Sequence, residues 1–294
     1  AIGLVERRYA LEADRSVAVY PSYLHLNRYR MMAVSDRLIM AGQRKVRRAS
    51  QQVEFEHIRE YVPGDDRRSV NQKATARRGR LMVNQYQDER SQAIYCLIDA
   101  GRTMKMPFGG LSLLDRSINA ALAISSVAMR KEDRAGLVVF SNKVHTHLGA
   151  ARERGHMNKV LEALYAQRTD HAESDMDALY VAVKRAVPQR SLLLLFTNFE
   201  SLSGARRQLP RIRSLAATHM VVVIFFLNSE LEEDLRAPVQ DTAGVYVRTL
   251  TERYLHEKRA IAKELERHGI ASVLTRPENL TVDAINKSRA LPSC

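Results

Sequence analysis

Short apolar segments that alternate with helical patterns constrain the fold of this chain more than any other feature. AIYCLIDA at 93–100 is a continuous apolar run, which is typical of a strand buried on both faces. Further strands are predicted at 134–141, 191–198, 219–228 and 271–276, with 143–148 as a hairpin partner of the first of these. Helices are predicted at 112–130, 157–167, 175–187, 204–217 and 248–268. The alternation predicts an α/β fold with a doubly wound, mostly parallel sheet.

Two of the predicted helices carry end signals. Ser112 and Asp115 have the spacing of a capping box at the start of the first helix. Gly269 follows the last one, and glycine is the residue most often found just after a helix.

The first part of the chain has a different character. Residues 1–90 form a predicted irregular, basic region with short strands such as 16–21 and 81–86, and residues 91–294 form the α/β domain.

The most charged stretch of the first part is YVPGDDRRSVNQKATARRGR at 61–80. Its Pro-Gly pair predicts a turn, and Asp65 or Asp66 is a candidate cap for a following helix. The arginines that stand out here are Arg67, Arg68, Arg77 and Arg78. They would either pair with carboxylates of the sheet domain or dock a partner; we favour the first role and keep the second open.

The net charge of +13 is compatible with an acidic partner, and it does not distinguish among nucleic acid, an anionic membrane surface and an acidic protein. Aromatic residues make up only 6% of the chain and Trp is absent, so few side chains are available to stack on bases. The basic residues are also spread along the chain. Binding of nucleic acid is therefore the disfavoured alternative.

Cysteine usage and hydropathy bear on location. Cys96 lies within an apolar run and is expected in the core, and the other cysteine is Cys294; this usage fits a reducing compartment, and we expect a cytoplasmic protein. The longest apolar run, at 220–227, is too short to span a bilayer. Because residue 1 is Ala, a membrane anchor upstream of this sequence stays open.

No catalytic signature is present in the sequence. It lacks a phosphate-binding G-x-x-x-x-G-K-[ST], a dinucleotide-binding G-x-G-x-x-G, a G-x-S-x-G nucleophile elbow and an H-E-x-x-H zinc motif. We therefore expect a noncatalytic protein.

Oxygen-bearing side chains gather in three predicted loops. Ligands of open α/β sheets bind beyond the carboxyl ends of the strands, and these loops lie there: DAGRTM at 99–104, TDHAESDMD at 169–177 and TNFES at 197–201. Carboxylate, hydroxyl and amide oxygens suit a hard cation such as Mg²⁺.

The pattern D-x-G-x-T at 99–103 resembles the start of the metal-ion-dependent adhesion site of von Willebrand factor A domains, D-x-S-x-S followed by a Thr and an Asp. The resemblance implies a weakened site for Mg²⁺ or another divalent cation, built from Asp99, Thr103, Ser174 and Asn198. Gly101 replaces the first Ser, and it would also let the loop turn tightly. Two plainer interpretations remain: Asp99 binds amides of its own loop, and Ser174 with Asp177 caps a helix. Arg102, in the same loop, is a further partner-binding candidate.

The block at 54–86 resembles the signature of the bacterial family called domain of unknown function fifty-eight, and the similarity extends over about residues 15–287. Members combine a von Willebrand A-like half with, often, preceding membrane helices, and are commonly encoded beside MoxR-type AAA+ ATPases. The family usually has a Trp where this chain has Gln72. The resemblance implies the fold and the class of partner, and we predict a noncatalytic adaptor that acts with such an ATPase and its client proteins in the assembly or maturation of protein complexes. A nucleic-acid-binding module and a metal-dependent adhesion domain are the alternatives.

Overall fold

A computed structural model describes residues 53–63, 65–66, 69–88, 91–108, 110–228, 231, 242–277 and 279–290. The predicted strand at 16–21 and the candidates Arg67 and Arg68 lie outside these described residues.

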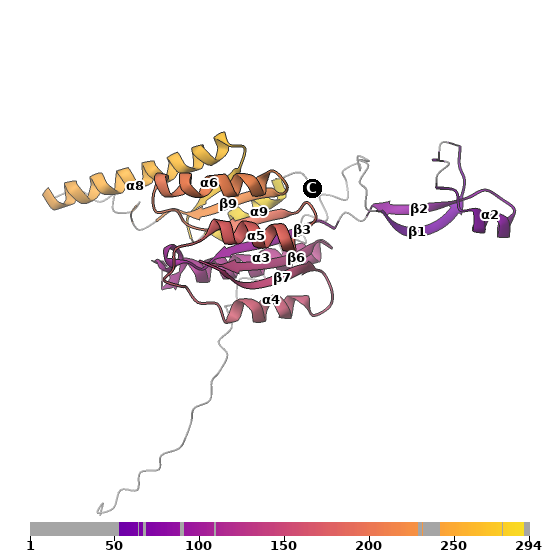
Figure 1. Ribbon diagram of the computed structural model, residues 1–294, viewed down its shortest axis with the longest axis horizontal. Helices are drawn as coiled ribbons and strands as arrows, with labels where there is room; N and C mark the ends of the chain where they lie inside the picture. Colours follow the sequence, from indigo (N-terminus) through magenta and orange to yellow (C-terminus); the bar gives the residue numbers. More distant parts are fainter. Residues whose placement is uncertain are drawn as a thin grey trace, which may run out of the picture.

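A six-stranded sheet forms the centre of the α/β domain (Figure 1). Its strands are β3 (Ala93–Asp99), β6 (Arg134–Phe140), β7 (Val144–Ala151), β8 (Leu192–Phe196), β9 (Met220–Phe226) and β10 (Ala271–Thr275). They lie in the order β10-β9-β8-β3-β6-β7, and all neighbours are parallel except the β6–β7 hairpin. The predicted α/β class and mostly parallel sheet are confirmed. From β3 the chain adds β6 and β7 toward one edge of the sheet, and it then adds β8, β9 and β10 toward the other edge. The point of reversal in the sheet therefore lies between the neighbouring strands β3 and β8.

Helices cover both faces of this sheet. The first face carries α3 (Leu113–Arg130), α4 (His156–Tyr165) and α9 (Leu280–Ala290). The second carries α5 (Met176–Ala186), α6 (Leu202–Ala216) and α8 (Thr242–Arg267). Two short elements, β4 (Pro107–Phe108) and β5 (Leu111–Ser112), form a small hairpin before α3. α9 was not predicted, and α8 begins earlier than the predicted 248.

The apolar runs produce three layers, with the sheet between two layers of helices. Each central strand contributes side chains to a hydrophobic core on either face of the sheet. In β3, Ile94, Cys96 and Ile98 pack under α3, whereas Tyr95 and Leu97 pack under α5 and α6. Every residue of β3 is buried, which explains why its sequence shows no polar alternation. α3 begins with the predicted capping box: Ser112 Oγ accepts from Asp115 N, and Asp115 Oδ2 accepts from Ser112 N.

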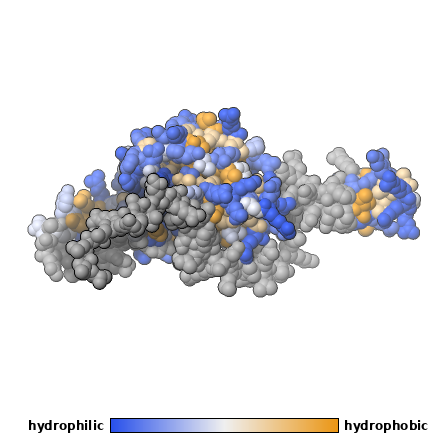
Figure 2. All heavy atoms as spheres, turned by 90° about the horizontal axis from the view of Figure 1, so that it is seen from below, coloured by the Kyte–Doolittle hydropathy of each residue, from blue (hydrophilic) through white to orange (hydrophobic). Residues whose placement is uncertain are grey.

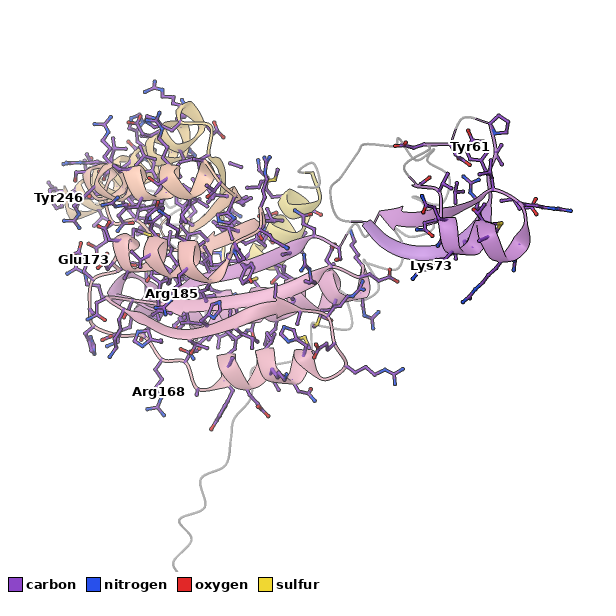
Figure 3. All side chains as sticks on the ribbon, turned by 45° about the vertical axis from the view of Figure 1, so that its right-hand side comes forward. Tyr61, Lys73, Arg168, Glu173, Arg185 and Tyr246 are labelled. Atoms are coloured by element: carbon purple, nitrogen blue, oxygen red, sulfur yellow. The ribbon has the colours of Figure 1, made fainter. Side chains whose placement is uncertain are left out.

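A second unit lies to one side of this domain (Figure 1). It consists of β1 (Val53–Glu60) paired antiparallel with β2 (Met82–Asp88), and α2 (Gln72–Arg78) connects them. β2 was predicted and β1 was not. Figure 3 shows Tyr61 and Lys73 projecting from this unit. Gln72 is the first residue of α2, and its side chain is exposed.

Neither Asp65 nor Asp66, the predicted helix caps, lies at the start of α2. α2 is capped by Asn71, whose side chain accepts from Ala74 N. Asp65 instead binds both terminal nitrogens of Arg59 at 2.7 and 2.8 Å, and it accepts from Val62 N. The Asp65 carboxylate thus links the segment after β1 to Arg59 of that strand. It takes no part in the start of α2, which Asn71 caps.

Arg77 and Arg78 occupy the last turn of α2 and are exposed. Within the part of the chain that the structure describes, neither forms an ion pair. The carboxylates paired inside this unit, Asp65 and Glu60, are held by Arg59 and Arg80. The expectation that Arg77 and Arg78 pair with the sheet domain has no support here, and docking of a partner stays a prediction for them.

Hydrophilic side chains cover much of the described surface, interrupted by scattered hydrophobic residues (Figure 2). No helix among the described residues is both long and apolar enough to cross a bilayer.

Cys96 should be nearly inert toward thiol reagents in the folded protein. It is 1% exposed in the middle of β3, and burial raises the pKa of its thiol to about 12. In a Cys294→Ser background, we expect alkylation of the native protein to run about a thousandfold or more below the rate of the unfolded protein, because the thiolate is the reactive form. Mass spectrometry of timed samples measures both rates. Equal rates would show that β3 is accessible in solution.

Candidate functional site

Four polar residues meet where β3 and β8 end, beside the point at which the chain reverses its direction across the sheet. Asp99 is the last residue of β3, and Thr197 and Asn198 follow β8 directly. Ser174 comes from the loop before α5. Such edges are the usual binding sites of open α/β sheets because adjacent loops diverge there.

Asp99 forms the centre of this group. Its side chain is fully buried; Oδ1 accepts from Ser174 Oγ at 2.6 Å and from Gly101 N at 2.8 Å. Oδ2 accepts from Thr197 Oγ1 at 2.7 Å. Burial raises the pKa of this carboxyl, and the three donors oppose that shift by stabilising the ionised form. The interpretation of Asp99 as a ligand of its own loop is confirmed at Gly101, but the carboxylate also ties together two other loops.

Ser174 does not cap α5. The N-cap is Asp175, whose Oδ1 accepts from Asp177 N and Ala178 N. This frees the Ser174 hydroxyl to donate to Asp99 across the loops. The cap therefore lies one residue later than the capping interpretation placed it. Ser and Asp are both strong N-caps, and Ser174 and Asp175 are adjacent in the sequence.

Gly101 is required for space and not for an unusual backbone. Its φ is −69° and its ψ is 177°, which any residue can adopt, so the turn closed by the Met104 N to Gly101 O bond does not require a glycine. A Cβ at this position would lie 2.3 Å from Ser174 Oγ and 3.1 Å from Ala172 O. The Ser174–Asp99 hydrogen bond therefore occupies the volume that a serine side chain at position 101 would need.

Asn198 is paired with a buried lysine that the sequence analysis did not identify. Lys258 Nζ donates to Asn198 Oδ1 at 2.6 Å and to the backbone oxygen of Phe199 at 2.5 Å. Lys258 lies on α8 and is 2% exposed. Burial lowers the pKa of its ammonium group to about 8, against the opposing influence of Glu257 and Glu200. The helical spacing could have indicated this burial. Lys258 lies three residues after Leu255 and three before Ile261, and both of these are buried on the apolar side of α8.

Thr103 and Arg102 stand on η2 (Arg102–Lys105), the short helix after β3. Thr103 Oγ1 is buried and has no hydrogen-bond partner within the described residues. Arg102 is exposed and forms an ion pair with Glu200 at 3.0 Å.

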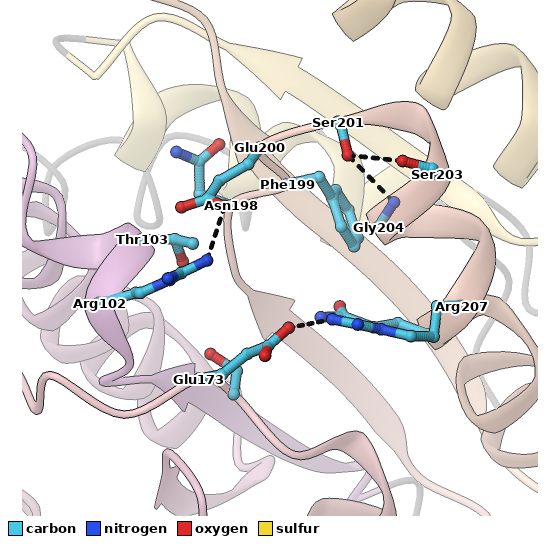
Figure 4. A pocket seen from close by; sticks show the side chains of 12 residues that line it. Arg102, Thr103, Glu173, Asn198, Phe199, Glu200, Ser201, Ser203, Gly204 and Arg207 are labelled. Carbon is cyan, nitrogen blue, oxygen red and sulfur yellow. Dashed lines mark hydrogen bonds and ion pairs between the residues drawn. The ribbon is translucent and has the colours of Figure 1, made fainter.

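Two adjoining pockets open beside these residues. One has a volume of about 480 Å³, and Figure 4 shows it with the Arg102–Glu200 and Arg207–Glu173 ion pairs across its mouth. The second, of about 800 Å³, is bordered by Lys258 and is called the Lys258 pocket below. Its apolar wall consists of Met106, Pro107, Phe199 and Tyr254. Both pockets share Thr103 and Asn198.

The structure thus gathers the predicted metal ligands Asp99, Thr103, Ser174 and Asn198 at one edge of the sheet, with Arg102 beside them. Their arrangement does not fit a divalent cation. Both Asp99 oxygens are engaged by protein donors, and Asn198 faces an ammonium group that would repel a dication. Among the side-chain oxygens of these four residues, the buried Thr103 Oγ1 is the one without a hydrogen-bond partner within the described part of the chain. Nor do the described residues contain a cluster of three or more His, Cys, Asp or Glu side chains suited to a metal ion.

Comparison with known proteins defines the family. Residues 57–268 match the family described as "Protein of unknown function DUF58", and the chain belongs to it. Similar sequences include the uncharacterized proteins Mb1516 of Mycobacterium bovis and Rv1480 of Mycobacterium tuberculosis, each 24% identical over 170 residues, or 57% of this chain. That match covers 53% of each relative, so the chain spans about half the length of the curated relatives it matches.

Similar solved structures include the conserved hypothetical protein BatB from Bacteroides thetaiotaomicron, at 11% identity and a TM-score of 0.45, covering 68% of this chain and all of that one. The SpRpn10 VWA domain has 12% identity and a TM-score of 0.41, covering 67% of this chain and 95% of that domain. These similarities are weak, and the fold class rests on the strand order given above.

Proposed function

We propose that this chain is a noncatalytic protein-binding module that uses the edge of the sheet around Asp99 and the exposed side of α8. The observation that carries the proposal is a run of exposed hydrophobic side chains on the first half of α8: Val245, Tyr246, Val247 and Leu250. Large apolar side chains gathered on one surface segment mark sites of protein association. The family resemblance adds the class of partner, a MoxR-type AAA+ ATPase with its client proteins.

The chemistry of the nearby site supports a noncatalytic role. The carboxylate of Asp99 is held by three donors, and Lys258 Nζ by two acceptors. A general base or nucleophile needs a free lone pair within reach of a substrate; the Asp99 carboxylate is fully buried beneath its three donors, and an ammonium group has no lone pair. Four of the exposed charges around the pockets form two surface ion pairs, Arg102–Glu200 and Arg207–Glu173, which adapt readily to a protein partner.

A pull-down with a MoxR-type AAA+ ATPase from the same organism tests the proposal. We expect the wild type to be retained and Tyr246→Ala to bind about tenfold or more weakly, as for an aromatic anchor at an interface. Val181→Ala is the matched control because Val181 is also an exposed hydrophobic residue but lies on α5. Equal retention of both variants would remove α8 from the interface, and absence of wild-type binding would remove the ATPase as the partner.

A further inference from the structure

The Lys258 pocket contains a cation that its own chain satisfies only in part. An ammonium group has three protons, and Lys258 Nζ uses two of them on Asn198 Oδ1 and the Phe199 oxygen. No third acceptor occurs within the described residues; the Tyr254 ring centroid lies 5.2 Å from Nζ. A buried charge with an unused donor is costly unless a ligand completes it.

The charged and apolar residues that line the Lys258 pocket indicate the chemical class of that ligand. Arg102, Lys105 and Lys258 contribute three positive charges to the pocket, and Glu200 contributes the one carboxylate, which Arg102 already binds. Thr103 adds a buried hydroxyl without a partner. Met106, Pro107, Phe199 and Tyr254 supply an apolar wall. An anion attached to an apolar stem complements this combination, since the wall takes the stem and the cations take the charge.

We propose that the Lys258 pocket binds a glutamate or aspartate side chain of a partner protein, and that Lys258 is the internal cation that receives it without a divalent metal. The inference rests on the proposed protein-binding function and names the residue chemistry that the partner would present. Lys258 Nζ would form a charge-assisted hydrogen bond to the incoming carboxylate while keeping its bonds to Asn198 and Phe199. Arg102, which has several donors, would contact the same carboxylate at the rim.

The contacts around Asp99 explain why the cation would be a side chain. In a metal-dependent site, carboxylate oxygens face the ion; here Asp99 Oδ1 accepts from Ser174 Oγ and Oδ2 accepts from Thr197 Oγ1. Gly101 leaves no room for a further hydroxyl ligand. The positive charge hydrogen-bonded to Asn198 within the described residues is the ammonium group of Lys258.

The test uses a probe and no partner. Isotope-labelled protein is titrated, with amide NMR as the readout, with N-acetyl-leucyl-glutamate amide and separately with the glutamine analogue. We expect shifts at Met106, Phe199 and Tyr254 with the glutamate peptide, and binding of the neutral analogue about tenfold or more weaker because it lacks the charge. Addition of EDTA or Mg²⁺ should leave the affinity unchanged.

Two variants locate the effect. Lys258→Met replaces the side chain with an unbranched, uncharged one that is one atom shorter, and it should abolish the difference between the two peptides. Lys159→Met, at an exposed lysine on α4, should preserve it. If Lys258→Met does not fold, Thr103→Val serves instead and should weaken the glutamate peptide severalfold.

Outcomes for this inference and for the proposed function are separable. Shifts confined to other surfaces, equal binding of the two peptides or a requirement for Mg²⁺ would overturn the inference even if the ATPase is retained in the pull-down. Selective binding of the glutamate peptide would support it even if the ATPase is not retained.

Discussion

Gly101→Ala should destabilise the protein by about 3 kcal/mol, because one added methyl group strikes the contacts that hold three loops together. Its Cβ would lie 2.3 Å from Ser174 Oγ and 3.0 Å from Asp99 Oδ1. Overpacking costs about 1–3 kcal/mol, and loss of a hydrogen bond to a buried carboxylate costs a similar amount. Since the backbone at Gly101 is ordinary, no conformational penalty contributes. Denaturant unfolding of the variant and the wild type measures the difference.

A double-mutant cycle and a surface glycine provide the controls. Ser174→Ala removes the atom nearest to the new Cβ, so Gly101→Ala should cost at least about 1 kcal/mol less in that background. Gly149→Ala, on β7, places a Cβ with no atom within 4 Å and should leave stability nearly unchanged. Additive effects of Gly101→Ala and Ser174→Ala would show that the two positions are not in contact in solution.

The sequence predicted the central sheet well because burial on both faces leaves a strong pattern. The run at 191–198 became β8 and that at 219–228 became β9, each with almost continuous burial. β1 gives no comparable signal: VEFEHIRE pairs only with β2, so charged residues are tolerated along it. α9 was missed since, among its described side chains, only Leu280 and Ala284 are buried.

The site was predicted in its location and composition but not in its bonding. The rule that ligands bind beyond strand ends brought Asp99, Ser174 and Asn198 together correctly. Which donors occupy the Asp99 oxygens depends on the positions of the loops that carry Ser174 and Thr197, and a linear pattern does not contain these positions. The role of Gly101 likewise depends on the position of Ser174, which is distant in sequence.

Lys258 was overlooked for a different reason. A lysine on a mostly polar helix is usually solvated, and α8 contains many charged residues. Its burial depends on where the loop after β8 lies, because Asn198 and the Phe199 carbonyl provide the two acceptors that make burial tolerable. Tyr254, one turn earlier on α8, lies beside the ammonium group and completes the enclosure.

The stability difference between Lys258→Met and the wild type should change by about 3 kcal/mol between neutral pH and the ordinary pKa of lysine. Burial lowers the pKa of Lys258 from 10.5 to about 8, so between these values the unfolded chain binds more protons than the folded one. Wild-type stability therefore gains a contribution as pH rises through that window, and below about pH 8 the contribution is absent. Lys258→Met lacks this gain, so its stability relative to wild type must fall over the same range.

Subtracting the two proteins isolates Lys258, because tyrosines and other lysines titrate in both. Glu257 and Glu200 favour the charged form, and their removal would lower the pKa of Lys258 further. Lys159→Met, at an exposed lysine of α4, is the matched control for removal of a lysine. A flat difference for Lys258→Met would mean that the ammonium group is hydrated in the folded protein. The Lys258 pocket would then lack the desolvated charge that its selectivity for a carboxylate requires, so this measurement bears on the binding inference without any ligand being present.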